Sequence, residues 1–199
     1  MHCQAADSNV YYYVMVTVGI DEVGRGCWAG PLVAGAVVLS NPVAGLKDSK
    51  KLTKLARERL HGLITDSGAA VGLGWVTPAE IDEIGLTAAV RLAMERALAA
   101  IPIGYDEVII DGNLNFLAHL PNTRELIKAD DLIPAVSAAS IMAKVERDRY
   151  MTLMNLEYPE YGFDKHEGYG TATHLAALQQ HGLTTLHRRS FKPVRALVQ

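Results

Sequence analysis

The chain has 199 residues, of which 49% are hydrophobic and 21% are charged. A chain of this length buries enough apolar surface to fold as one compact domain without disulfides or a structural metal. Its two cysteines, Cys3 and Cys27, lack the Cys-x-x-Cys spacing of a zinc or redox pair and fit a reducing cytoplasm. The net charge of −3 excludes a strongly basic protein, although basic side chains gather within residues 47–54 and 188–195.

The first apolar run covers residues 10–18 and predicts a strand. No basic segment precedes it, no small-residue cleavage site follows it, and it is too short to span a bilayer. We therefore expect neither a signal peptide nor membrane association. Whether residues 1–14 belong to the natural product stays open, since a start at Met15 would still leave a short strand before Asp21.

Further apolar runs predict strands at 32–39, 71–76, 107–110 and 125–128. Helices are predicted at 53–65, from 77 towards 100 with a break near Gly85, at 138–156 and at 172–180. The second of these begins with a strong signal, because Thr77 can cap it, Pro78 follows and Glu80 completes a capping box. Early strands followed by alternating helices and strands indicate a mixed sheet flanked by helices.

Four carboxylates stand where apolar runs stop: Asp21, Glu22, Asp111 and Asp130. Acids at the ends of buried strands converge at the rim of a sheet, where they repel one another unless cations lie between them. Oxygen-only ligands suit Mg²⁺ or Mn²⁺, which keep positions open for phosphate oxygens and water. This pattern predicts metal-assisted phosphate chemistry.

Six sequence blocks carry a family resemblance. They are Gly19-Ile-Asp-Glu-Val-Gly-Arg-Gly26, Asp48-Ser-Lys-Lys-Leu-Thr53, Ile110-Asp-Gly112, Lys128-Ala-Asp130 with Ser137 to Asp148, His166-Glu-Gly-Tyr-Gly-Thr171, and His187-Arg-Arg-Ser-Phe-Lys-Pro-Val194. In this order the blocks resemble those of bacterial ribonuclease HII, the type 2 ribonuclease H family, over residues 19–195. The chain departs from the family at Ala129, where a glycine is common, and carries Trp28 at a variable position, where it lines the substrate groove or, as we favour, covers core.

The resemblance implies a ribonuclease H-like α/β fold, with a central mixed five-stranded sheet flanked by helices. It implies a single catalytic domain over residues 1–199, in which a small helical region from about residue 159 to 199 contacts substrate. The implied activity is metal-dependent hydrolysis of the RNA strand of RNA–DNA hybrids. It includes cutting 5′ of ribonucleotides embedded in duplex DNA, leaving 3′-hydroxyl and 5′-phosphate ends, and would serve ribonucleotide removal and DNA repair.

The resemblance also implies roles for single residues. The four carboxylates would hold two divalent ions, Mg²⁺ or Mn²⁺, and be catalytic. The backbone of Gly24, Arg25 and Gly26 would contact the ribose 2′-hydroxyl, the group that distinguishes RNA from DNA, and Arg25 a nearby phosphate. Tyr169 would stack on the deoxyribose that follows the ribonucleotide.

Basic and polar side chains supply the remaining candidates. Ser49 and Lys50 are expected to bind substrate phosphates, and Arg188 belongs to a basic tail that could contact the duplex backbone. Lys144 is expected to pair with Asp148 four residues later, with phosphate contact as a second interpretation.

Competing interpretations have weaker support. The histidines His166, His174, His181 and His187 fit no zinc-finger or protease spacing, and the Gly19–Gly26 segment lacks the Gly-Lys-Ser/Thr of a phosphate-binding loop. A junction resolvase or transposase-type nuclease would share the acids but not the glycine-rich and His-x-Gly-Tyr blocks. A hybrid-binding module without catalysis would gain nothing from four acids facing phosphates. We expect a cytoplasmic monomer, and the sequence leaves the preferred metal and a replication-clamp partner open.

Overall fold

The fold is built on one five-stranded sheet. The computed structural model describes residues 15–197, and the strands are β1 (Thr17–Val23), β2 (Leu32–Val38), β3 (Ala70–Val76), β4 (Glu107–Asp111) and β5 (Thr123–Leu126). Their order across the sheet is β3-β2-β1-β4-β5. β1, β2 and β3 pair antiparallel, whereas β4 lies parallel to both β1 and β5. The predicted mixed five-stranded sheet is therefore confirmed.

Eight α-helices and two short 3₁₀ helices surround this sheet in the described chain. They are η1 (Ser49–Lys51), α1 (Lys54–Asp66), α2 (Pro78–Ile84), α3 (Leu86–Ala99), α4 (Ala129–Leu132), α5 (Pro134–Glu157), η2 (Pro159–Tyr161), α6 (Phe163–His166), α7 (Ala172–His181) and α8 (Lys192–Arg195). The Thr77 capping box and the break at Gly85 are both present. None of the helices in residues 15–197 combines the length and the apolar character needed to cross a membrane.

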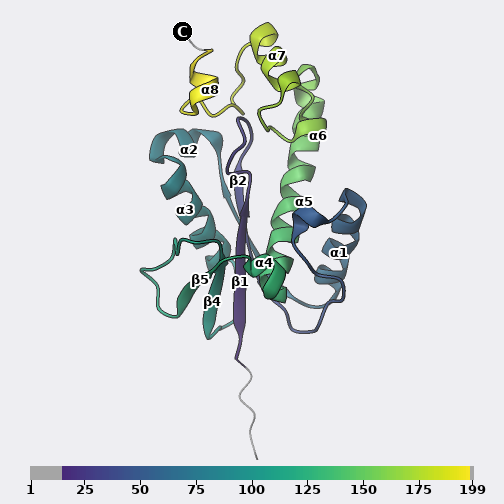
Figure 1. Cartoon of the computed structure of the whole chain (residues 1–199), viewed down its shortest axis with the longest axis vertical. Coiled ribbons are helices and arrows are strands. Elements are labelled where there is room, and N and C mark those ends of the chain that lie inside the picture. Colours follow the sequence, from purple (N-terminus) through teal and green to yellow (C-terminus); the bar gives the residue numbers. More distant parts are fainter. Residues whose placement is uncertain (1–14, 198–199) are drawn as a thin grey trace, which may run out of the picture.

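Helices cover both faces of the sheet (Figure 1). One face packs against α2 and α3, and the other packs against α5 and α1. Close approach is possible because glycines stand where helices cross strands. A Cβ on Gly19 would collide with the backbone of α5, and one on Gly74 with the backbone of α3. The alanines along both helices allow the same contact from the other side, so the layers lie close together.

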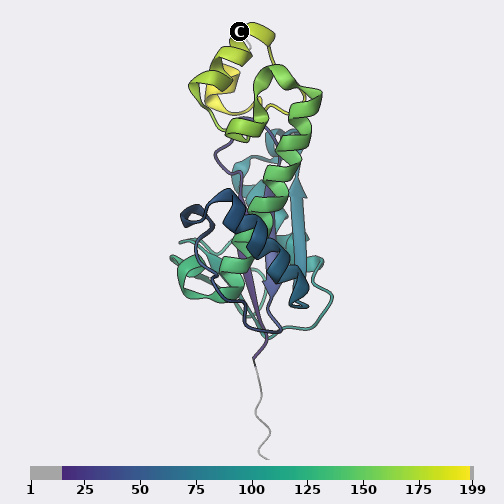
Figure 2. The same cartoon turned by 90° about the vertical axis from the view of Figure 1, so that its right-hand side faces the viewer.

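A second, smaller core lies beyond the sheet, around the carboxyl end of α5. Buried members include Met151, Tyr161, Phe163 and Leu178, and Trp28 packs against them from the β1–β2 loop. Figure 2 shows η2, α6, α7 and α8 gathered at this end of the molecule, away from α1 and the sheet. The contact of Trp28 with this core agrees with the core interpretation of that residue.

Three predicted boundaries were wrong. The last strand ends at Leu126 instead of 128, so Asp130 lies in the first turn of α4 and not at a strand end. The long helix starts at Pro134, four residues earlier than expected, because proline is favoured in a first turn. The first strand was placed at 10–18, and β1 starts at Thr17, while residues 10–14 lie outside the described part of the chain.

Candidate active site

Strand pairing brings the acids of two distant blocks to one edge of the sheet. In the parallel pair of β1 and β4, Ile20 lies opposite Ile110, so the residues that follow, Asp21 and Asp111, lie side by side where this pairing ends. The prediction that β1 stops before Asp21 was wrong, because β1 continues to Val23 and stays paired with β2 there. Glu22 comes next on β1. The sequence order of the strands hides this proximity, since ninety residues separate the two acids along the chain.

Asp21 and Asp130 are the buried members of the four acids, with 7% and 6% of their surfaces exposed, whereas Glu22 and Asp111 are partly exposed. Burial, together with the charges of Glu22 and Asp111, raises the pKa of Asp21 to about 7, although a hydrogen bond from Ser140 acts to lower it. Burial also raises the pKa of Glu22, opposed by Arg25, whose Nη1 lies 3.3 Å from Glu22 Oε1. Both carboxylates of β1 thus resist ionisation without a cation beside them.

Asp111 and Asp130 form the other half of the site. Asp111 Oδ1 accepts hydrogen bonds from the backbone amides of Ala129, at 2.8 Å, and Asp130, at 3.4 Å. This bond fixes the start of α4 against β4 and explains how Asp130 reaches the site from a helix. Burial, with the charges of Asp111 and Asp48, raises the pKa of Asp130 to about 6.

Lys50 is the cation that faces these acids. Burial acts to lower its pKa, but the charges of Asp21, Asp48, Asp130 and Asp111 outweigh burial and raise it. Lys50 borders two cavities. The larger, of about 620 Å³, also contains Asp111 and Asp130. The smaller, of about 60 Å³, is lined by Asp21, Glu22, Val23, Ser49, Ser140, Lys144 and Tyr169.

The donor set fits a hard divalent cation by its chemistry. All four side chains offer oxygen, Asp21 and Asp130 have pKa values near neutrality, and the charge of Asp111 contributes to both of these raised values. In the arrangement of residues 15–197, no three His, Cys, Asp or Glu side chains are spaced closely enough to hold a metal ion as they stand. Ligation would therefore require the carboxylates to converge from the two edges of the site.

The Gly24-Arg25-Gly26 turn lies directly after Glu22. Gly24 has φ +86° and a Cβ there would collide with the Arg147 side chain, so the fold itself requires this glycine. Gly26 differs, because its φ is not positive and a Cβ would meet open space. Neither conformation nor packing within the chain requires a glycine at position 26, so contact of its backbone with a ligand stays a prediction.

Tyr169 reaches the same site from the C-terminal region. Its side chain is 40% exposed and lines the smaller cavity together with Asp21 and Glu22. Lys144 Nζ lies 5.9 Å from the centre of its ring. Burial raises the pKa of Tyr169 to about 12, with a contribution from Cys27, so the phenol stays protonated. The structure therefore brings together acids and tyrosine from blocks at opposite ends of the chain.

Comparison with known proteins identifies the family. The family model described as Ribonuclease HII matches residues 18–194. The chain belongs to the ribonuclease HII family. The ribonuclease HII of Shewanella halifaxensis is 50% identical over 183 residues, covering 89% of this chain and 88% of that protein. The ribonuclease HII of Shewanella sp. strain MR-7 is 44% identical and covers 98% and 95%.

Solved structures agree with this assignment. Ribonuclease H2 from Pyrococcus horikoshii matches with a TM-score of 0.78 at 30% identity, covering 92% of this chain and 97% of that one. The RNase HII of Archaeoglobus fulgidus, solved in a complex with PCNA, gives a TM-score of 0.78 at 26% identity, with coverage of 89% and 96%. The ribonuclease H-like fold is thus confirmed. Membership of the ribonuclease HII family makes this chain a ribonuclease H, a hydrolase that acts on RNA–DNA substrates.

Two further predicted residues of this ribonuclease HII, Ser49 and Lys144, lie beside the acids. Ser49 is buried and its Oγ lies 2.8 Å from Ser140 Oγ, beside Asp21. Lys144 forms the predicted ion pair with Asp148, at 2.8 Å, and a second one with Glu167, also at 2.8 Å. Both residues line the smaller cavity. Lys144 is thus already paired with two carboxylates, whereas Ser49 contacts Ser140, the residue that hydrogen-bonds to Asp21.

Arg188 does not lie on an exposed basic tail, which corrects that expectation. Its guanidinium has no exposed surface and donates to the carbonyl oxygens of Gly30, at 2.9 and 3.0 Å, and Arg25, at 3.2 Å. Burial lowers its pKa to about 10. A guanidinium enclosed by backbone carbonyls holds the β1–β2 loop in place and is shielded from a phosphate.

Arg147 performs a similar task and was missed in the sequence. It is fully buried and donates to the carbonyl oxygens of Pro31, Glu167 and Ala29, at 2.8, 2.9 and 3.2 Å. These bonds tie the β1–β2 loop to the segment that carries Tyr169. The sequence Val145-Glu-Arg-Asp-Arg149 gives no signal for this, since it reads as an ordinary charged helix face.

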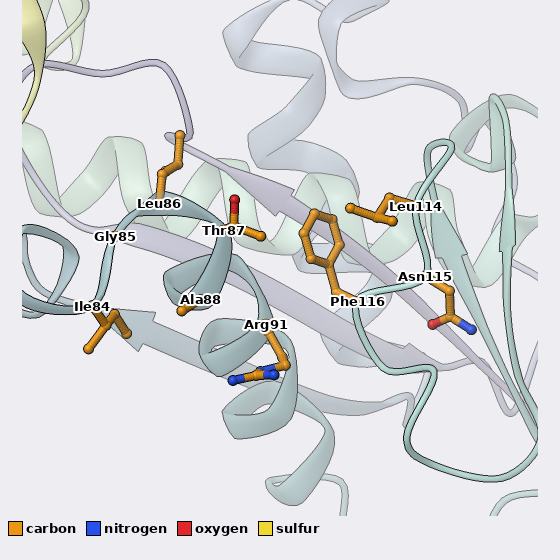
Figure 3. Close-up of a pocket in the computed structure, with 9 residues that line it drawn as sticks. All are labelled: Ile84, Gly85, Leu86, Thr87, Ala88, Arg91, Leu114, Asn115 and Phe116. Carbon is orange, nitrogen blue, oxygen red and sulfur yellow. The ribbon is translucent and has the colours of Figure 1, made fainter.

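A mainly apolar hollow of about 590 Å³ lies at the junction of α2 and α3, facing the loop after Asp111 (Figure 3). It is lined in part by Ile84, Leu86 and Phe116 and contains none of the four acids. Phe116 connects it to the site, because the Arg25 guanidinium lies 5.6 Å from the centre of its ring. Phe116 thereby steadies Arg25 from the loop after β4.

Proposed function

We propose that this ribonuclease HII cuts the strand that contains RNA on the 5′ side of ribonucleotides embedded in duplex DNA, using two divalent cations, Mg²⁺ or Mn²⁺. The products carry 3′-hydroxyl and 5′-phosphate ends. One observation carries the proposal: the β1 acids and Tyr169 line a single cavity. A cleavage centre and a residue suited to stacking on a sugar are therefore neighbours.

The four carboxylates suit the cations that such hydrolysis needs. Bound there, divalent ions would activate water and offset the charge that develops on the phosphate and the leaving oxygen. Asp21, Glu22, Asp111 and Asp130 would hold them, and ionisation of Asp21 and Asp130 would be favoured by the added positive charge. A structural neighbour, a ribonuclease HIII, was solved in complex with Mn²⁺.

The chain's own residues would hold and discriminate the substrate. Gly26 presents backbone with open space before it, which suits close contact with a ribose 2′-hydroxyl. Lys50 at the border of both cavities suits a phosphate, which it would position without reading sequence. Tyr169 offers a protonated, half-exposed ring, on which a deoxyribose would stack where an extra hydroxyl would not fit.

The decisive test is a labelled DNA duplex with one internal ribonucleotide. We expect a single cut immediately 5′ of the ribonucleotide with Mg²⁺ or Mn²⁺, and none with EDTA or with Asp111→Asn. A duplex without ribonucleotides is the substrate control. Cleavage of a long RNA–DNA hybrid without cleavage of the single-ribonucleotide duplex would overturn the role given to Tyr169.

A sliding clamp is a candidate partner, because the Archaeoglobus relative was solved in complex with PCNA. We expect a purified clamp to bind this chain and to leave its cutting position unchanged. Size-exclusion chromatography of the mixture measures binding, and separate elution of the two proteins would contradict the partnership.

A further inference from the structure

Three histidines are buried together in the small core around the carboxyl end of α5. His166, His174 and His187 are 7%, 0% and 2% exposed, and the rings of His166 and His174 stack at 4.6 Å. The proposed hydrolysis uses none of them. Their hydrogen bonds nevertheless end on the backbone of Tyr169.

The direction of these bonds follows from their partners. His174 Nδ1 lies 2.9 Å from the carbonyl oxygen of Tyr169, which can only accept, so Nδ1 carries the proton. At the other end, the backbone amide of Thr184 donates to His187 Nδ1 at 2.9 Å, so that nitrogen carries the lone pair. The two remaining nitrogens, His187 Nε2 and His174 Nε2, lie 3.1 Å apart.

Both ends therefore require the same assignment in the middle. His187 is a neutral imidazole protonated at Nε2, His174 is one protonated at Nδ1, and His187 donates to His174. The chain of bonds runs from the Thr184 amide through His187 and His174 to the Tyr169 carbonyl; below, we call it the histidine relay. A proton added to either ring would set two N–H groups against each other and break it.

The Tyr169 carbonyl accepts a hydrogen bond from one donor besides His174. The Thr171 amide shares that carbonyl at 2.9 Å, and the Tyr169 amide donates to the carbonyl of His166 at 2.8 Å. His166 is fixed in turn, since its Nε2 donates to the Tyr161 carbonyl at 2.8 Å. The backbone of Tyr169 is thus held on both sides by histidines, while its ring projects to the cavity of the acids.

We propose that His174 is a positioning residue that sets the preference of this enzyme for the junction between a ribonucleotide and a deoxyribonucleotide, because it donates to the Tyr169 carbonyl, and that His187 holds the His174 ring in the tautomer that can donate. This inference rests on the proposed function of Tyr169. A small displacement of a positioning group is costly in an active site, since about 1 Å can cost on the order of a hundredfold in rate.

The surroundings of the relay keep it neutral. The titratable groups that face its rings are His166 of α6 and Tyr161 of η2, with His181 of α7 beyond Tyr161, and the remaining ring neighbours are Trp28 and Phe163. Burial, followed by the neighbouring histidines, lowers the pKa of His174 and of His187 to about 4. The relay is therefore intact at neutral pH.

Two variants of one residue separate the ends of the relay. In His174→Asn, the amide nitrogen replaces Nδ1 and can still donate to the Tyr169 carbonyl. In His174→Gln, the amide replaces Nε2, so the bond to His187 can persist while the Tyr169 carbonyl keeps only the Thr171 amide as a donor. Tyr161→Phe is the matched control, because it removes the 2.8 Å bond to the Gly182 carbonyl in the same core without touching the relay.

The readout is kcat/KM on a single-ribonucleotide duplex relative to a long hybrid. We expect His174→Gln to lower this ratio by about tenfold or more, and His174→Asn and Tyr161→Phe to keep it within about twofold. Equal ratios for the Asn and Gln variants would overturn the inference. Tyr169→Ala runs alongside: if it keeps the wild-type ratio, the proposed role of Tyr169 fails, whereas its loss with an unchanged Gln variant refutes the relay alone.

A second measurement reads the tautomers of the relay in the wild-type protein itself. ¹⁵N-edited NMR of histidine-labelled protein at pH 7 should show His174 as the Nδ1–H form and His187 as the Nε2–H form. Assignment uses the spectra of the His174→Asn and His187→Gln variants. The opposite tautomers, or a charged ring at this pH, would overturn the relay.

Discussion

The four acids and the three buried histidines are two clusters of titratable side chains that respond to burial in opposite ways. In the histidine cluster each polar nitrogen has a partner when the rings are neutral. In the acid cluster, Asp21 and Asp130 have pKa values raised to about 7 and 6, and neighbouring carboxylates contribute to both shifts. A cluster whose members satisfy one another supports a structure, whereas one whose members repel is prepared for a missing cation.

The largest effect is expected for Asp21→Asn, which should lower turnover but raise the stability of the metal-free protein. Asp21→Asn should lower turnover by on the order of a hundredfold to a thousandfold, because it removes a ligand at the reacting phosphate. The same variant should be more stable than wild type without metal at pH 8, by at least about 1 kcal/mol, since ionising this buried group is costly. Turnover and urea unfolding in EDTA measure the two effects.

Asp66→Asn is the control for that variant. Asp66 is exposed and is the last residue of α1, a helix that carries none of the four acids. Asp66→Asn should leave turnover within about twofold of wild type. A metal-free Asp21→Asn protein that is less stable than wild type would show that the acid cluster is not under repulsion.

The affinity for metal should depend on pH in a direction set by the raised pKa values. Cations must displace protons from Asp21 below about pH 7 and from Asp130 below about pH 6. Affinity for Mn²⁺ should therefore weaken as pH falls from 8 to 6, approaching about tenfold per pH unit for each proton displaced. Isothermal titration calorimetry measures it, and an affinity that is constant over this range would contradict the acid assignment.

The two clusters should give opposite slopes of stability against pH in the metal-free protein. For His174 and His187, pKa values of about 4 lie below the unfolded value, so the unfolded chain binds more protons between pH 4 and 6.5 and stability falls as pH falls through that window. For Asp21, the native pKa of about 7 lies above the ordinary value of 3.8. The native state therefore binds more protons between these two pH values, and stability falls as pH rises from 3.8 to about 7. Each slope is at most about 1.4 kcal/mol per pH unit and group.

Urea unfolding in EDTA at pH 5, 6 and 7 tests this opposition. Because the two windows overlap, the measured slope is the sum of both contributions. His174→Asn should shift this slope towards a loss of stability with rising pH, and Asp21→Asn should shift it towards a loss of stability with falling pH. Variants that shift the curves without changing their slopes would show that neither group titrates as the structure implies.

The smallest effect on stability is expected for a substitution of Gly26. Gly24, in the same turn, should be far more sensitive to substitution. Gly26→Ala should change stability by less than about 0.5 kcal/mol, since its Cβ meets open space, yet raise KM for the ribonucleotide duplex several-fold. Gly24→Ala should instead destabilise by about 1–3 kcal/mol through its positive φ and the Arg147 side chain. Thermal unfolding and steady-state kinetics check both, and an unchanged KM for Gly26→Ala would refute ligand contact there.

Much of this architecture was predictable because local signals and the fold agree. The Thr77 capping box, the break at Gly85 and the acids in the last residues of β1 and β4 can be recognised from neighbouring residues in the sequence. Asp130 shows where such signals end. Its block predicts a strand end, but the bond from Asp111 to the Ala129 amide turns the chain into α4, and that partner lies eighteen residues away.

Buried arginines mark the other limit of the sequence. Arg147 and Arg188 stand among charged neighbours, so periodicity places them at the surface. Both guanidinium groups donate to backbone carbonyls of the β1–β2 loop, and such partners leave no trace in composition. The histidine spacing likewise argued against zinc without indicating a relay, since its links pass through backbone atoms.

The helix α5 is unbroken from Pro134 to Glu157, so it sets a fixed distance between the carboxylate site and the small core that holds the histidines. Ser140 hydrogen-bonds beside Asp21, and eleven residues later Met151 is buried in the core that holds the histidines. At about 1.5 Å per residue, these points are separated by about 16 Å of rigid rod. Inserting one residue would turn the far end by about 100°, so the length of α5 fixes where the core that holds the Tyr169 backbone lies relative to the carboxylates.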